Sequence, residues 1–231
     1  MSAKKTTTKS EAKRLRFAVN AEESVSGLLT VPAGARAIYV LAHGAGAGME
    51  HPFLAKIATL LAERGVATLR YQFPYMEKKS GRPDRPPLAQ AAVKAAVAEA
   101  AKVAPGLPIF AGGKSFGGRM SSQAEAEGAM GIKGLAFLGF PLHPPGAPAT
   151  ARGDHLADVK VPMLFLQGTK DEFAELNLLE PLVKSLGRRA TLHLIPDANH
   201  SFRVPVKSGK TEADVLAELA EALVGWIDRH R

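Results

Sequence analysis

The 231-residue chain contains no cysteine. This absence excludes disulfide frameworks, thiolate metal sites and cysteine nucleophiles. It also suits a reducing compartment, so we expect a cytoplasmic protein. Because a chain of this length buries roughly 70% of its unfolded surface when it folds, it needs no covalent cross-link for stability.

Long apolar runs are missing as well. No stretch approaches the roughly 18 apolar residues of a membrane span, and no apolar segment of signal-peptide length follows the first lysines. Aromatic residues make up only 6% of the chain, and there is no aromatic stacking platform or nucleic-acid recognition motif. We therefore expect neither a membrane nor a nucleic-acid partner.

Positive charge is in excess, with a formal net charge of +8 at pH 7. Five of these net charges lie in residues 1–16, which hold six basic residues and Glu11. Residues 1–13 are small, polar and charged, which is typical of a disordered basic tail; an arm that binds an anionic surface is the alternative. Residues 14–231 are then expected to form a single domain.

Short apolar segments alternate with longer segments of helical periodicity. This pattern predicts an α/β domain with a mostly parallel central sheet and helices on both faces. The expected strands are residues 16–19, 27–31, 37–42, 66–73, 108–112, 132–140, 161–166 and 190–195. The expected helices are residues 51–64, 88–103, 174–186 and 211–229, together with one that ends near residue 127; residues 74–87 and 141–148 are expected to be irregular loops.

The sharpest motif is Gly113-Lys114-Ser115-Phe116-Gly117, a G-x-S-x-G sequence. A serine on a tight strand-to-helix turn needs small neighbours, because the chain must fold back and turn the hydroxyl outward. Such a match occurs by chance in about one chain in ten of this glycine content, so its context matters more. Here it directly follows an expected strand and opens an expected helix, as a nucleophile elbow requires.

Two nucleotide-binding interpretations of the glycines fail at one position each. A phosphate-binding P-loop ending in Gly113-Lys114-Ser115 would need glycine at residue 108, which is Pro108. A dinucleotide-binding motif starting at Gly44 would need glycine at residue 49, which is Met49. A tight turn without chemistry remains the alternative to a nucleophile elbow, and we expect no cofactor.

A serine hydroxyl is a weak nucleophile that needs a base oriented by an acid. Of the seven histidines, His200 alone lies late in the chain in a loop that directly follows a strand. Asp171 follows the expected strand at 161–166 and is the best acid. Ser115, Asp171 and His200 therefore occur in the chain order nucleophile, acid, base. Structural or solvent-exposed roles are expected for His51, His155, His193 and His230.

From residue 37 to the C-terminus the chain resembles the small α/β-hydrolases of the dienelactone-hydrolase-like kind. The resemblance rests on HGAGAGM at 43–49, FPY at 73–75, GGKSFGGR at 112–119, GTKDEF at 168–173 and DANHSF at 197–202. Dienelactone hydrolase itself uses a cysteine nucleophile. The serine in this chain means that its lactone substrate does not carry over.

The resemblance implies an α/β-hydrolase fold in which Ser115 attacks an acyl carbonyl, His200 transfers protons and Asp171 orients the imidazole. It also implies an oxyanion hole made of the backbone N–H groups of Ala45 and Phe116. His43 is expected to brace the loop that carries Ala45. A metal site that combines His43 with His51 lacks further ligands, so no metal is expected.

Lids in this superfamily usually follow the strand that is expected to end at residue 140, where only about 20 residues precede the next strand. The resemblance therefore implies a shallow site without a large cap domain. Tyr75, Met76, Leu142 and His143 are the candidate substrate contacts, although ordinary loop packing is the alternative for each.

The leading hypothesis is a serine hydrolase that acts on a small-molecule acyl substrate, a carboxylic ester or thioester. The alternative is a non-catalytic hydrolase-like scaffold that binds a protein partner, because the resembling group includes a subunit of an acetyltransferase complex. The sequence does not predict the oligomeric state.

Overall fold

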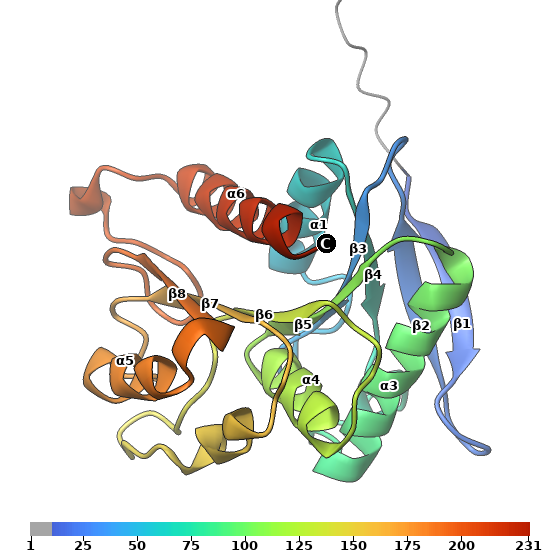
Figure 1. Ribbon diagram of the computed structural model, residues 1–231, viewed down its shortest axis with the longest axis horizontal. Helices are drawn as coiled ribbons and strands as arrows, with labels where there is room; N and C mark the ends of the chain where they lie inside the picture. The colour runs from blue at the N-terminus through green and yellow to red at the C-terminus, as the bar shows by residue number, and fades with distance from the viewer. Residues whose placement is uncertain (1–10) are drawn as a thin grey trace, which may run out of the picture.

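The computed structural model describes residues 11–231, and its centre is a twisted sheet of eight strands (Figure 1). The strand order is β1-β2-β4-β3-β5-β6-β7-β8. β1 and β2 pair antiparallel, as do β2 and β4, and every other pairing is parallel. The strands are β1 (Lys13–Ala18), β2 (Ser24–Thr30), β3 (Ala37–Ala42), β4 (Val66–Tyr71), β5 (Ile109–Lys114), β6 (Gly134–Leu138), β7 (Met163–Gly168) and β8 (Ala190–Ile195).

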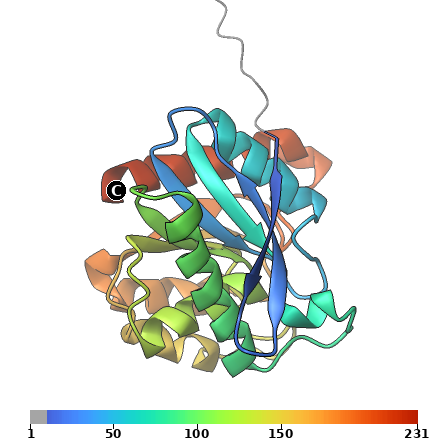
Figure 2. The same ribbon diagram turned by 90° about the vertical axis from the view of Figure 1, so that its right-hand side faces the viewer.

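Helices cover both faces of the sheet. α1 and α6 lie on one face, and α3, α4 and α5 lie on the other (Figure 1). Figure 2 shows the β1–β2 hairpin at the near edge of the sheet. The helices are α1 (Pro52–Glu63), α2 (Pro74–Glu77), α3 (Pro86–Val103), α4 (Phe116–Glu127), α5 (Leu176–Ser185) and α6 (Glu212–His230), with 3₁₀ turns η1 (Ala151–Ala157), η2 (Gly187–Arg189) and η3 (Val206–Ser208).

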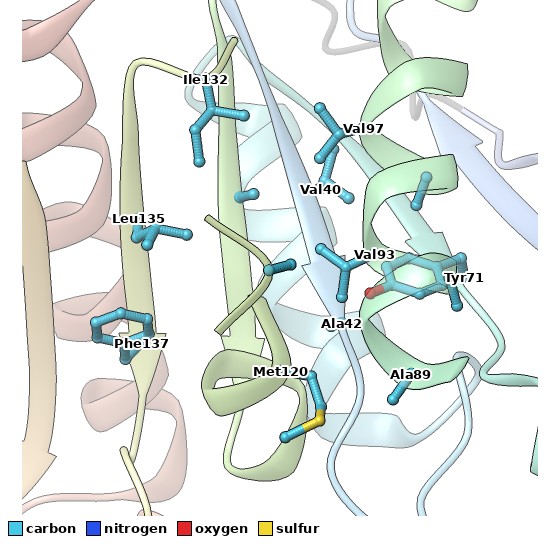
Figure 3. Close-up of a cluster of buried hydrophobic side chains, with 14 of the residues drawn as sticks. Val40, Ala42, Tyr71, Ala89, Val93, Val97, Met120, Ile132, Leu135 and Phe137 are labelled. Carbon is cyan, nitrogen blue, oxygen red and sulfur yellow. The ribbon is translucent and has the colours of Figure 1, made fainter. Parts of the chain in front are cut away.

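The central strands are apolar because both of their faces are buried. All residues of β3, β4, β6 and β7 are buried, as expected for parallel strands covered by helices. On one face, the side chains of Val40 and Ala42 from β3 lie beside Val93 and Val97 from α3 (Figure 3). On the other face, the ring of Trp226 from α6 packs edge-on against Phe110, with ring centroids 5.6 Å apart.

The predicted α/β class, mostly parallel sheet and absence of a large cap domain are confirmed. Only short turns, among them η1, lie between β6 and β7. The predicted C-terminal boundary of the tail, residue 13, lies too far along the chain, because Lys13 already pairs with Leu29 in the sheet. The rest of that prediction falls on residues 1–10, which lie outside the described residues.

The loop predicted at residues 74–87 was wrong at both ends. Its first part forms α2, because Pro74 occupies the first helical position, where its missing N–H costs nothing. The carboxylate of Asp84 also accepts a hydrogen bond from Tyr75 N, at 3.0 Å. Its last part belongs to α3, which begins at Pro86 for the same reason.

The end of β5 has no room for side chains, which explains its glycines. Gly113 has a φ of +139°, and a Cβ atom there would collide with the backbone of Ala42 in β3. Gly112 has a φ of +142°, and a Cβ atom there would collide with the backbone of Ala136 in β6. β5 can therefore pair with β3 and β6 right up to the serine turn only because these residues are glycines.

We expect Gly113→Ala to lower the free energy of unfolding by more than about 3 kcal/mol, because it adds both backbone strain and a clash with a buried strand. Urea denaturation of the full chain measures this loss. Gly128→Ala is the control, because Gly128 has an extended φ of 176° and no atom within 4 Å of its Cβ position; its effect should stay within about 0.5 kcal/mol. Equal losses for the two variants would contradict the packing explanation.

Candidate active site

Ser115 occupies a strained turn between β5 and α4. Its φ of 49° and ψ of −116° are unfavourable for a residue with a side chain. Two backbone hydrogen bonds hold it there: Ser115 N donates to Leu138 O at 3.2 Å, and Ser115 O accepts from Arg119 N at 3.1 Å. The sheet and the first turn of α4 together therefore fix the direction of the serine side chain.

Gly117 allows α4 to start directly against β3. A Cβ atom at this position would lie 2.6 Å from both the Cβ atom of Ala42 and the carbonyl oxygen of His43. The small residues around Ser115 thus have the role that the G-x-S-x-G motif predicts.

A continuous hydrogen-bond chain joins the three side chains that the sequence singled out. Ser115 Oγ lies 2.8 Å from His200 Nε2, and His200 Nδ1 lies 2.7 Å from Asp171 Oδ2. Because a carboxylate only accepts, Nδ1 carries the imidazole proton and Nε2 is free to accept the serine proton. Ser115 directly follows β5, and Asp171 and His200 lie in the loops after β7 and β8, at the carboxyl edge of the parallel strands.

Asp171 is completely enclosed, whereas His200 keeps 14% of its side chain exposed. The carboxylate accepts hydrogen bonds from three donors. Oδ2 accepts from Gln167 Nε2 at 2.5 Å as well as from His200, and Oδ1 accepts from Phe173 N at 2.8 Å. The Phe173 ring also lies over the imidazole, with centroids 4.2 Å apart. These contacts leave the carboxylate one orientation, in which Oδ2 faces His200.

Gln167 was not singled out from the sequence. It is buried at the end of β7 and accepts a hydrogen bond from Phe140 N at 2.9 Å while donating to Asp171. The available signal was a polar side chain inside the otherwise apolar run VPMLFLQ. A fully buried amide of this kind needs polar partners, which this site provides.

The loop after β3 lies against Ser115. A Cβ atom at Gly44 would be 3.8 Å from the Cβ atom of Ser115. Within residues 11–231, neither Ala45 N nor Phe116 N donates a hydrogen bond to a protein acceptor. Ala45 itself is exposed. Both predicted oxyanion-hole amides are therefore uncommitted.

Two buried side chains hold this loop in place. Tyr75 Oη accepts a hydrogen bond from Gly46 N at 2.8 Å. His43 donates from Nδ1 to Gly44 O at 2.7 Å and accepts at Nε2 from Phe73 N at 3.1 Å. Burial lowers the pKa of His43 to about 4, so its ring is neutral near pH 7 and can donate and accept at once. His43 therefore has the bracing role that was expected of it.

The four candidate substrate contacts differ in exposure. Leu142 and His143 are fully buried, and the His143 ring bonds Pro144 O at 2.9 Å and Glu175 N at 3.3 Å. These two residues support the loop from inside. Tyr75 is 2% exposed, and Met76 is partly exposed beside Gly48. Substrate contact stays a prediction for all four residues.

The remaining histidines have structural contacts. His51 Nδ1 accepts from Phe53 N at 3.2 Å and so caps α1. His155 lies 2.8 Å from Ser122 Oγ, and burial lowers its pKa to about 4. His193 lies 3.3 Å from Glu218, and His230 bonds Trp226 O at 2.8 Å. Across residues 11–231, no three His, Asp or Glu side chains cluster in a way that could hold a metal ion.

In the described part of the chain, no helix combines the length and the apolar character needed to cross a bilayer.

Several solved structures share this fold. A dienelactone hydrolase from Anabaena variabilis is 22% identical, with a TM-score of 0.78 over 96% of this chain and 99% of that one. A lidless α/β serine hydrolase from Xanthomonas campestris is 21% identical, with a TM-score of 0.73 over 95% of this chain and 94% of that one. An esterase domain from Rhodothermus marinus is 17% identical, with a TM-score of 0.72 over 95% of this chain and 99% of that one.

At these identities the likeness is one of fold. The sequence itself matches a protein family described as an alpha/beta hydrolase domain, and the match covers residues 35–228. Because this match spans most of the chain and includes the ends of β3, β5, β7 and β8, the protein belongs to the α/β-hydrolase family.

Proposed function

We propose that the protein is a serine hydrolase that cleaves small carboxylic esters or thioesters through an acyl-enzyme intermediate. The observation that carries this proposal is the hydrogen-bond chain from Ser115 through His200 to Asp171. A nucleophile in contact with a base that a buried acid orients is the arrangement that acyl transfer requires. Membership in a hydrolase family supports the same reaction class.

In the first half of the reaction, Ser115 Oγ attacks the acyl carbonyl carbon while His200 Nε2 takes the hydroxyl proton. The imidazolium is then stabilised by Asp171, whose other donors keep its carboxylate in place. The tetrahedral intermediate collapses when His200 gives its proton to the departing alcohol or thiol. Water repeats the sequence on the acyl-enzyme and releases the acid.

The negative charge on the carbonyl oxygen needs donors that are already in position. Ala45 N and Phe116 N are the proposed donors, since neither has another acceptor among residues 11–231. Gly46 N is committed to Tyr75 Oη instead. The role of Tyr75 is therefore to hold the peptide that follows Ala45 in one orientation.

Phe173 is partly exposed and its ring lies over His200, and Phe116, also partly exposed, follows Ser115 in the chain. Between β6 and η1, where a cap would be inserted, the chain forms a loop in which residues 144–150 are exposed. These features support small or extended acyl substrates that need no enclosing lid. A protein-binding scaffold without catalysis is the alternative, and labelling of the serine separates the two.

A fluorophosphonate probe should label the protein near neutral pH, and Ser115→Ala should abolish the labelling. We expect Asp171→Asn and His200→Gln to lower kcat/KM on p-nitrophenyl acetate by about 10³-fold or more, because each breaks the proton relay. Ser201→Ala is the control, since Ser201 is exposed beside His200 and does not contact Ser115 or Asp171 through its hydroxyl. An unlabelled wild-type protein would favour the scaffold.

Tyr75→Phe should lower kcat by about 10-fold with little change in KM, because the Ala45–Gly46 peptide loses the acceptor that orients it. Steady-state kinetics with the same ester measures the effect. Tyr71→Phe is the matched control: Tyr71 is equally buried, and its hydroxyl has no hydrogen-bond partner among the described residues. If both variants lost the same activity, the orienting role of Tyr75 would be wrong.

A further inference from the structure

Lys114 places an amine inside the protein directly beside the candidate catalytic residues. It is the last residue of β5 and immediately precedes Ser115, and it pairs with Leu138 of β6. Its Nζ atom is buried and has no hydrogen-bond partner among residues 11–231. Burying an ammonium group that lacks a partner costs free energy, so the position of this amine needs a physical explanation.

Gly139 shows where the amine lies. A Cβ atom at this glycine would be 3.1 Å from Lys114 Nζ and 3.5 Å from both Asp171 Oδ2 and His200 Cε1. The amine, the carboxylate and the imidazole therefore surround Gly139 at the end of β6, where a side chain would crowd the amine. The ring of Phe202 lies on the amine as well, 5.5 Å from centroid to Nζ.

The charges that face Lys114 come from two loops. The carboxylates of Asp171 and Glu172, after β7, favour the charged amine, and the imidazole of His200, after β8, lies beside Gly139 as the amine does. In the loop after β3, Gly44 lies against the Lys114 side chain, because a Cβ atom there would be 3.6 Å from Lys114 Cγ. Burial outweighs the two carboxylates and lowers the pKa of Lys114 from 10.5 to about 8. The amine is therefore mostly charged at pH 7 and mostly neutral above pH 9.

A purely structural role does not require this charge. A methionine side chain has a similar length, fills irregular apolar gaps and carries no ion to desolvate. The amine, by contrast, is worse solvated in the folded chain than in the unfolded chain, so the folded state gains stability as the pH rises from about 8 to 10.5. A group that reduces stability beside reactive side chains is a candidate for a functional role.

We propose that Lys114 is a positioning residue whose buried positive charge acts on His200 and keeps its imidazole in the neutral, proton-accepting form. The cation lies near Cε1 of the ring and near the carboxylate oxygen that binds the ring, so it opposes formation of the imidazolium. Its field also makes the imidazolium a stronger acid when it returns the proton to the leaving group. This role rests on the proposed hydrolase mechanism.

The direct test is the titration of His200, followed by the NMR signal of its Cε1 proton in the full chain and assigned by its loss in His200→Gln. We expect Lys114→Met to raise the pKa of His200 by about one unit, because removal of a nearby positive charge favours the imidazolium. Lys114→Arg keeps the charge and should leave this pKa within about 0.3 units of the wild-type value.

Lys170→Met is the matched control. Lys170 is next to Asp171 in the chain but is exposed, so water screens its charge and its removal should not shift the pKa of His200. Thermal unfolding at pH 7 checks the fold, and Lys114→Met should be at least as stable as wild type because it removes a desolvated ion. An unchanged His200 pKa in a folded Lys114→Met protein would overturn the proposal.

Kinetics then separates this inference from the proposed function. If esters are hydrolysed, the acidic limb of the kcat/KM profile should move to higher pH in Lys114→Met by the same interval as the NMR titration. A shift of the NMR titration without any ester hydrolysis in wild type would support the electrostatic coupling and contradict the hydrolase function. Hydrolysis with an unshifted limb would contradict the coupling alone. The Glu172→Gln variant checks the charge on Lys114. Because the carboxylate of Glu172 favours the charged amine, its loss should lower the pKa of Lys114, and the alkaline titration of this lysine should move to lower pH.

Discussion

The structure depends most on the close approach of the β5–α4 turn to β3. Gly113 and Gly117 let the backbone of this turn lie directly against Ala42 and His43, where any side chain would collide. Two backbone hydrogen bonds then hold Ser115 at a φ of 49°, a conformation that costs about 1–3 kcal/mol. The strain is useful because it directs the serine hydroxyl to His200, and the same approach brings the loop after β3 next to the serine.

Near this turn, two buried charged groups differ in their hydrogen-bond partners. The carboxylate of Asp171 accepts hydrogen bonds from Gln167, Phe173 and His200, so its charge is fully solvated by the protein. The amine of Lys114 has no such partner among residues 11–231 and is stabilised only at longer range. A satisfied anion and an unsatisfied cation border the same imidazole.

Much of the architecture could be predicted from local patterns. The strand at 190–195 was predicted with its observed bounds, Ser115 was selected by its G-x-S-x-G motif, and Asp171 and His200 were selected because each lies in a loop after a strand. Parallel strands end at one edge, so such residues gather without further information. α2 and the end of β5 were missed for a different reason. Pro74 was missed because proline is common in loops as well as at the first position of a helix. Gly113 and Lys114 were missed because they belong to a strand only through their pairing with Phe137 and Leu138.

By itself, the sequence determined the α/β class, the serine nucleophile candidate and its place at a strand-to-helix turn, because periodicity and glycine spacing act over a few neighbouring residues. Only the tertiary structure decided which side chains surround that turn. Tyr75 bonds Gly46 and Gln167 bonds Phe140, each across tens of residues along the chain, and the Lys114 amine is buried by elements that are distant in the sequence. A lysine beside the serine is an ordinary polar residue in the sequence, and it becomes a buried charge only when Gly139, Asp171 and Phe202 close around it.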